Sequence, residues 1–81
     1  MRDPNDEELK AIVSRVFGLE PSQIEDGSRR GELDGWDSLG QLELIGALEE
    51  AFGIEIDEDE ALDIETFADL RRVLSRLSSN A

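Results

Sequence analysis

Ser38 is the residue whose type and position most directly suggest chemistry. It follows Asp37 and precedes Leu39 at the expected start of a helix, within the stretch L-D-G-W-D-S-L-G-Q-L-E-L. A serine becomes nucleophilic when a base, usually histidine, removes its proton. The sequence has no histidine and no cysteine, and its single lysine, Lys10, belongs to no motif that would place it as a base. We therefore expect no catalytic residues and no enzymatic activity, and Ser38 is better suited to being modified.

The local pattern favours a modification site at Ser38 but does not require one. A phosphate on the serine oxygen would interact favourably with the helix dipole and with the backbone N–H groups of the first helical turn. Leu39 and the acids nearby would form a docking surface for a basic enzyme. The alternative is that Ser38 serves only as a helix cap.

The charge of the chain excludes several classes of partner. The 21 acidic residues outnumber the 8 basic ones, which gives a formal net charge of -13. Every charged residue between Arg30 and Arg71 is acidic. Such a surface repels nucleic acids and anionic lipid headgroups, and it attracts basic proteins. With no apolar stretch of membrane-spanning length and an acidic start, the sequence predicts a cytoplasmic monomer that binds neither nucleic acid nor membranes.

The run Asp57-Glu58-Asp59-Glu60 is dense in oxygen atoms that could bind a metal ion. A calcium-binding loop requires a glycine at its sixth position, which this stretch lacks. We therefore interpret the run as a solvated acidic turn and expect no metal site. A calcium-responsive acidic bundle stays open as an alternative, and calorimetry would have to show a saturable site to support it.

The spacing of apolar residues indicates an all-α fold. It predicts helices over residues 4–17 and 38–52, one or two helical turns over 57–62, and a last helix that begins at Thr66. A long loop joins the first two helices. We expect a four-helix bundle with three main helices and one short helix, formed by a single domain of residues 1–81 in which 78–81 fray.

Capping residues mark the ends of these helices. Asp3 is expected to cap the first helix, and Gly18 and Gly53 to end the first two. Asp37 can accept N–H groups at the start of the second helix, where Ser38-x-x-Gln41 also fits a capping box. Thr66-x-x-Asp69 fits a capping box at the start of the last helix.

A helical wheel divides the second helix into two faces. The face expected to enter the core comprises Leu42, Leu44, Ile45, Leu48 and Phe52. Leu39 lies on the opposite side beside Glu43, Gly46 and Glu50, which suggests a docking point rather than a packing residue. In the short helical segment and after it, Ala61, Leu62 and Ile64 are expected to turn inward.

A longer pattern surrounds Ser38. It consists of Asp37-Ser38-Leu39, then Leu42-Glu43-Leu44, then the run A-L-E-E-A-F-G-I-E-I over residues 47–56. It extends back to Leu33-Asp34-Gly35 and forward to Ile64-Glu65-Thr66-Phe67. In these residues the sequence resembles the acyl carrier protein family over most of its length.

The resemblance implies a fold, a cofactor and partners. Ser38 would receive 4′-phosphopantetheine from coenzyme A through a magnesium-dependent phosphopantetheinyl transferase, and the thiol of that arm would carry an acyl group as a thioester. Acyl ligases or synthases with basic docking surfaces would exchange the cargo. The positions that match the docking residues of such carriers are Asp37, Leu39, Glu43, Glu49 and Glu50. The wheel independently exposes all but Asp37, which precedes the helix, and Glu49, which it places near the apolar face.

Three residues depart from the pattern of fatty-acid carriers. Gly40 replaces an acid, Gly46 replaces an exposed apolar residue, and Trp36 replaces a small residue. These departures resemble stand-alone carriers of specialised pathways more than a housekeeping fatty-acid carrier. The family resemblance as a whole implies fatty acid or polyketide biosynthesis. The alternative function is an unmodified acidic adaptor bundle that binds a basic protein, and replacement of Ser38 would distinguish the two. The acyl cargo, and whether the bundle core encloses it, stay open.

Overall fold

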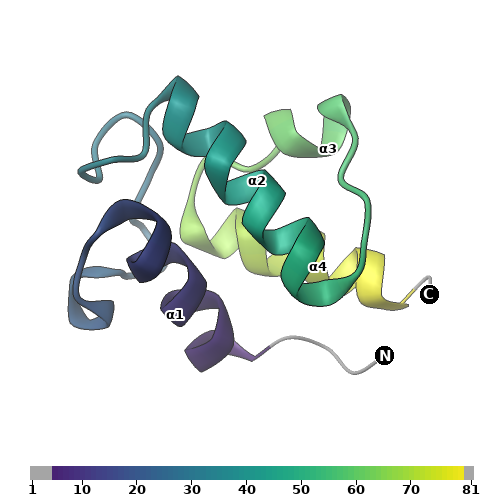
Figure 1. The fold of residues 1–81 in the computed structure, drawn as a ribbon, viewed down its shortest axis with the longest axis horizontal. Coiled ribbons are helices and arrows are strands. Elements are labelled where there is room, and N and C mark those ends of the chain that lie inside the picture. Colours follow the sequence, from purple (N-terminus) through teal and green to yellow (C-terminus); the bar gives the residue numbers. More distant parts are fainter. Residues whose placement is uncertain (1–4, 80–81) are drawn as a thin grey trace.

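The fold is a bundle of helices in the computed structural model, which describes residues 5–79 (Figure 1). Its elements are α1 (Asp6–Phe17), the 3₁₀ helix η1 (Pro21–Gln23), α2 (Ser38–Phe52), α3 (Glu58–Leu62) and α4 (Phe67–Ser79). Within this part of the chain the only β pairing is an isolated bridge between Arg29 and Thr66. The predicted all-α architecture, with three long helices and a short one, is confirmed. None of the described helices is long and apolar enough to span a membrane.

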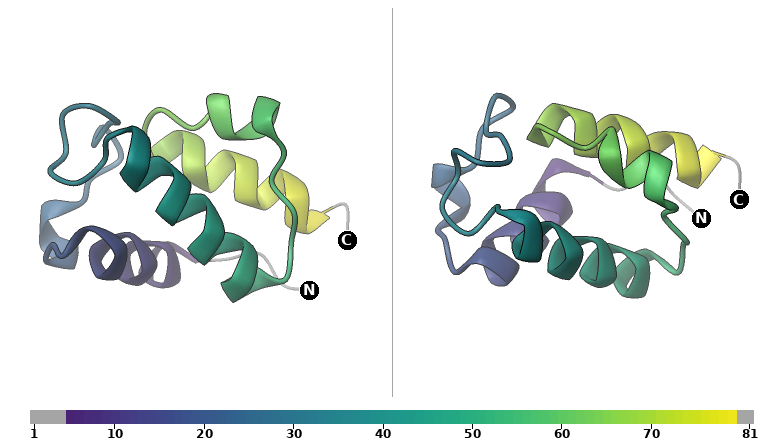
Figure 2. Two further views of the ribbon diagram at one scale, coloured as in Figure 1. Left: turned by 45° about the horizontal axis from the view of Figure 1, so that its top comes forward. Right: turned by 90° about the horizontal axis from the view of Figure 1, so that it is seen from above.

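The three long helices enclose one apolar core, and α3 lies beside α2 and α4 (Figure 2). α2 begins at the end of the bundle that carries the long connection between α1 and α2 (Figure 1). The core contains fully buried side chains from every long helix, because each helix repeats apolar residues at three- and four-residue spacing. They include Leu9, Val13, Leu44, Leu48, Phe67, Leu70, Val73 and Leu74.

The helix ends follow local capping rules. Asn5, not Asp3, caps α1: its side chain accepts the N–H of Glu8 at 2.8 Å, so the helix begins two residues later than predicted. Asp3 itself lies outside the described residues. Gly18 and Gly53 end α1 and α2 in the left-handed conformation, with φ of 71° and 63°, as expected.

α4 begins as predicted and ends later. The N–H of Asp69 donates to the Thr66 hydroxyl, and the N–H of Thr66 donates to the Asp69 carboxylate, each at 3.1 Å. This reciprocal pair is the expected capping box. The helix then continues to Ser79, and Ser78 is buried, so the prediction that the chain frays from Ser78 is wrong for the first two residues. Residues 80–81 lie outside the described part.

The predicted core face of α2 is wrong in one residue and incomplete in another. Leu42 is 70% exposed, whereas Gln41 is only 8% exposed. Leu44 and Leu48 are fully buried, and Ile45 and Phe52 are partly buried against the core. Because successive residues are about 100° apart on a helix, a core direction that passes through Gln41 turns its neighbour Leu42 to solvent.

The prediction for α3 and the residue that follows it is also wrong in one residue. Ile64, which follows it, is fully buried and Ala61 is partly buried, as expected. Leu62, however, is 66% exposed instead of turned inward. Asp57 and Glu60 cap this helix reciprocally, so two members of the acidic run are engaged in local structure.

Arg71 joins α4 to the start of α1 and to the long connection. Its guanidinium donates to Asp6 at 2.7 and 2.9 Å and to Asp26 at 2.6 Å, and it lies 5.5 Å from the centre of the Phe67 ring. The hydrogen bond from Arg71 holds the pKa of Asp26 below its ordinary value of 3.8. The folded state therefore prefers the ionised carboxylate.

This ion pair predicts a pH-dependent stability. Because the folded pKa of Asp26 is lowered, its contribution is fully present above the ordinary pKa and is lost as the pH falls through the folded value. We expect Asp26→Asn to lower the melting temperature near neutral pH, and we expect this deficit to shrink as the pH falls below 3.8. Thermal melts across this range, with Asp34→Asn as an exposed control in the same connection, test it. A deficit of Asp26→Asn that persists unchanged in acid would contradict the role of the carboxylate.

Candidate functional site

Ser38 is exposed and is the first residue of α2. Asp37 has an extended backbone and caps the helix, and its carboxylate accepts the N–H of Gly40 at 2.8 Å. The N–H groups of the first turn have no partner within a helix, so they make this end favourable for a negative group. Asp37 therefore acts as the predicted cap. Ser38 and Gln41 do not form a capping box, because Gln41 turns into the interior.

The loop before Ser38 rests directly on the first turn of α2. A β-carbon added at Gly40 would lie 1.9 Å from the carbonyl oxygen of Gly35 and 3.1 Å from Cε1 of Phe17. Gly35 itself has φ of 87°, a conformation that favours glycine. The absence of a side chain at Gly40 thus allows two backbone segments to touch. This contact accounts for the glycine found where fatty-acid carriers have an acid.

Trp36 and Gln41 fill the interior beneath the start of α2. Trp36 is only 1% exposed, and its ring centre lies 5.9 Å from that of Phe17. Its indole N–H donates to Oε1 of Gln41 at 2.7 Å, and Nε2 of Gln41 donates to the carbonyl of Ala61 at 2.9 Å. The loop, α2 and α3 are therefore joined by one side-chain amide. The burial of Gln41 was not predicted from the sequence, where this residue was expected to form a capping box with Ser38.

The residues predicted to dock partners lie around the exposed face of α2. Leu39 is 66% exposed, and Asp37, Glu43 and Glu50 are exposed as well. Leu42, which had been assigned to the core, joins this face. The structure thus brings an apolar pair and several carboxylates together beside Ser38, an arrangement suited to a partner with apolar and basic groups.

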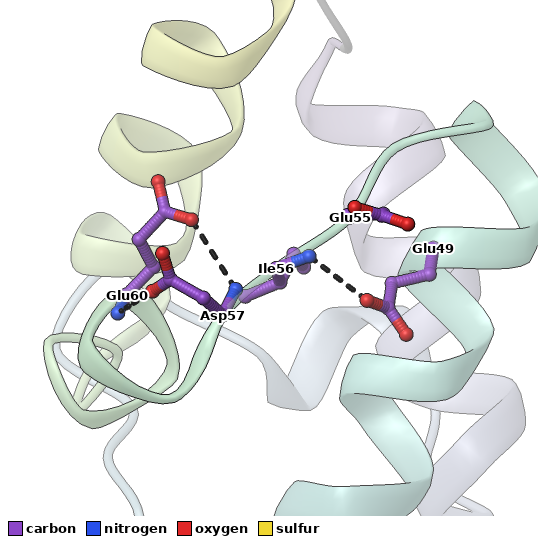
Figure 3. A pocket seen from close by; sticks show the side chains of 5 residues that line it. All are labelled: Glu49, Glu55, Ile56, Asp57 and Glu60. Carbon is purple, nitrogen blue, oxygen red and sulfur yellow. Dashed lines mark hydrogen bonds between the residues drawn. The ribbon is translucent and has the colours of Figure 1, made fainter.

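Glu49 differs from the other predicted docking residues. It is partly buried, and its carboxylate accepts the N–H of Ile56 at 2.8 Å in the connection between α2 and α3 (Figure 3). With Glu55, Asp57 and Glu60 it lines an acidic pocket of about 340 Å³. One of its oxygens therefore holds this connection in place. Among the described residues, no group of three or more acidic side chains is arranged to hold a metal ion.

The sequence that forms this site is similar to that of known proteins. Residues 7–74 match the model of a protein family described as the phosphopantetheine attachment site. The chain belongs to the acyl carrier protein family. It is 40% identical over 70 residues to acyl carrier proteins of Rhodopseudomonas palustris strains BisB18 and HaA2, an overlap of 86% of this chain and 89% of each relative. Acyl carrier proteins are carriers rather than enzymes, and 4′-phosphopantetheine is their cofactor.

Proposed function

We propose that Ser38 is the attachment point of 4′-phosphopantetheine and that this acyl carrier protein moves an acyl group between partner enzymes. The observation that supports the proposal is the exposed Ser38 at the capped start of α2, inside the matched residues 7–74. The attached group supplies a thiol that carries the acyl group as a thioester. The chain itself lacks cysteine, so no thiol of its own would compete for the acyl group.

The residues around Ser38 fit the phosphate of this cofactor. Asp37 fixes the helix start, and the first-turn N–H groups and the helix dipole favour the negative charge. The sequence has no histidine to remove the serine proton, so the transferase would supply the base. When the serine oxygen bonds to phosphorus, its proton leaves, the phosphoanhydride bond of coenzyme A breaks, and the nucleotide part departs with the electron pair.

The exposed face of α2 and the residues near Ser38 also suggest which partners and which kind of pathway the carrier serves. The exposed Leu39, Glu43 and Glu50 would meet basic surfaces of a phosphopantetheinyl transferase and of acyl ligases or synthases. The departures at Trp36 and Gly40 favour a specialised pathway. The carrier would work in the cytoplasm as a monomer.

Loading of Ser38 tests the proposal. After incubation with coenzyme A, magnesium and a broad-specificity transferase, the wild-type chain should gain the mass of one phosphopantetheine. Ser38→Ala should gain none, while Ser22→Ala, at an exposed serine in η1, should load like the wild type. A Ser38→Ala chain that still loads, or a folded wild-type chain that does not, would favour the acidic adaptor instead.

The charge on the exposed face of α2 leads to a separate prediction about loading. Glu43→Lys should lower the kcat/KM of loading about tenfold at low salt, because a repulsive charge replaces an attractive one beside Ser38. Glu25→Lys, an equal charge change in the long connection, should have little effect. The difference should shrink as salt is added. Equal effects of the two variants would show that only net charge matters.

A further inference from the structure

The gap between α2 and α3 is crossed by a buried polar bridge. Gln41 accepts a hydrogen bond from the Trp36 indole at 2.7 Å and donates to the carbonyls of Ala61 at 2.9 Å and Ile64 at 3.5 Å. Arg30 also donates to the Ile64 carbonyl, at 3.2 Å. No buried side-chain polar atom in the described part of the chain lacks a partner. The bridge is therefore a satisfied network, which rigidifies the region.

A mostly apolar groove lies outside this bridge. It has a volume of about 320 Å³, and its apolar residues are Leu42 of α2 and Ala61 and Leu62 of α3. The nearly buried Gln41 also lines the groove, and Arg30 and Glu58 contribute charged groups to its lining. Leu42 and Leu62 are 70% and 66% exposed, so the groove presents apolar surface to solvent.

We propose that the bridge formed by Trp36, Gln41 and Ala61 closes the bundle interior to the acyl cargo, which contacts the groove between Leu42 and Leu62 instead. The inference rests on Ser38 as the attachment point. Ser38 and Leu42 are four residues apart on one helix, so they lie on the same face one turn from each other. An apolar group tethered at Ser38 is thus held at high local concentration beside the groove.

The hydrogen bonds of the bridge determine whether the acyl chain lies in the interior or in the groove. Insertion of an alkyl chain between α2 and α3 would separate Gln41 from Trp36 and from Ala61. The Trp36 indole N–H and the Gln41 amide would then lack partners in an apolar interior, whereas the Ala61 carbonyl would keep the N–H of Ile64 at 3.1 Å. The free-energy cost of each such unpaired group equals the gain from burying about one to four methylene groups. The residues behind the bridge, such as Leu44 and Ile64, are already fully buried, so added volume would also strain the packing. Acyl chains up to about eight carbons should therefore stay outside.

The test compares acetyl and octanoyl forms of the loaded protein, prepared by the transferase from the acyl-coenzyme A and verified by intact mass. Hydroxylamine should cleave both thioesters at rates within about twofold of each other, after correction for the matching free acyl-pantetheines, because neither chain is enclosed. In methyl spectra, Leu42 and Leu62 should shift between the two forms, while Leu44 and Leu48 stay unchanged. The indole N–H signal of Trp36, the only tryptophan, should also stay unchanged.

Gln41→Ala provides the matched variant, since it removes the bridge and leaves space behind it. In this variant the octanoyl thioester should be cleaved about tenfold more slowly than the acetyl thioester. Protection of octanoyl in the wild type, or shifts at Leu44, Leu48 and the Trp36 indole, would overturn the proposal. So would a folded Gln41→Ala chain without protection. If this variant does not fold, the wild-type spectra alone decide. Failure of Ser38 to load at all would instead overturn the attachment on which the inference rests.

Discussion

Gly40→Ala is expected to lower the free energy of unfolding by about 3 kcal/mol, because the new methyl group has no space. Its carbon would lie 1.9 Å from the Gly35 carbonyl oxygen and 3.0 Å from the Gly35 carbonyl carbon. Both are backbone atoms, so relief requires the loop before Ser38 to move away from α2. Denaturant unfolding followed by circular dichroism measures the effect. The same movement should slow loading of the chain that stays folded.

Gly46→Ala is the matched control for this prediction. Gly46 lies in the same helix, is exposed, and has nothing within 4 Å of an added β-carbon. Alanine is favoured over glycine in a helix, so this variant should gain about 1 kcal/mol of stability. Opposite signs for the two substitutions would identify the Gly35–Gly40 contact as the cause. If both variants stabilise the chain, the close backbone approach is not present in solution.

Trp36→Ala is expected to remove at least about a third of the stability of the domain. The side chain is fully buried, packs against Phe17 and anchors the loop that leads to Ser38. Truncation of a buried tryptophan costs about 4 kcal/mol, and a domain of this size has only about 4 to 12 kcal/mol in total. The melting temperature should fall steeply, and a total near about 4 kcal/mol would leave the variant largely unfolded. Far-UV circular dichroism is the suitable probe because the variant lacks the fluorescent side chain.

Trp36→Phe separates packing from hydrogen bonding at this position. Phenylalanine retains much of the apolar contact but leaves Oε1 of Gln41 without its partner at 2.7 Å. The expected loss is about 2 kcal/mol, smaller than for alanine. Equal losses for the two variants would mean that the indole contributes through the hydrogen bond rather than through its volume.

The parts of the fold that local patterns control were predictable from the sequence. Asp37 caps α2, Thr66 and Asp69 cap α4, and Gly18 and Gly53 end their helices, because each of these interactions involves residues a few positions apart. The apolar stripes of α1 and α4 were predictable for the same reason: their spacing alone defines a buried face.

The errors on α2 occur where distant segments meet. Because leucine is apolar and glutamine is polar, we expected Leu42 in the core and Gln41 outside it. In the structure Gln41 is buried and Leu42 is exposed. Gln41 can be buried only because Trp36 and Ala61 offer its amide hydrogen-bond partners, and no local pattern indicates this pairing. One signal was present, since Gln41 lies between Leu48 and Ile45 in direction on the helical wheel. The contact between Gly40 and Gly35 likewise depends on the path of the loop.

The exposure of the residues around Ser38 was predictable from the sequence, whereas the hydrogen bond of Glu49 was not. Ser38, Leu39, Glu43 and Glu50 lie together on the exposed face of α2, as the wheel and the family resemblance indicated. Glu49 instead supports the connection to α3 through the N–H of Ile56. A side chain committed to a backbone hydrogen bond is less available to a partner, and the sequence alone gave no sign of that bond.

The most direct measurement is the location of the phosphopantetheine group within the loaded wild-type protein. Digestion and fragmentation mass spectrometry of the loaded chain would assign the added mass to one residue. We predict that all of it lies on Ser38, at the start of α2. Attachment to any of the other serines, such as Ser22 or Ser28, or a folded chain that accepts no phosphopantetheine, would contradict the proposed function.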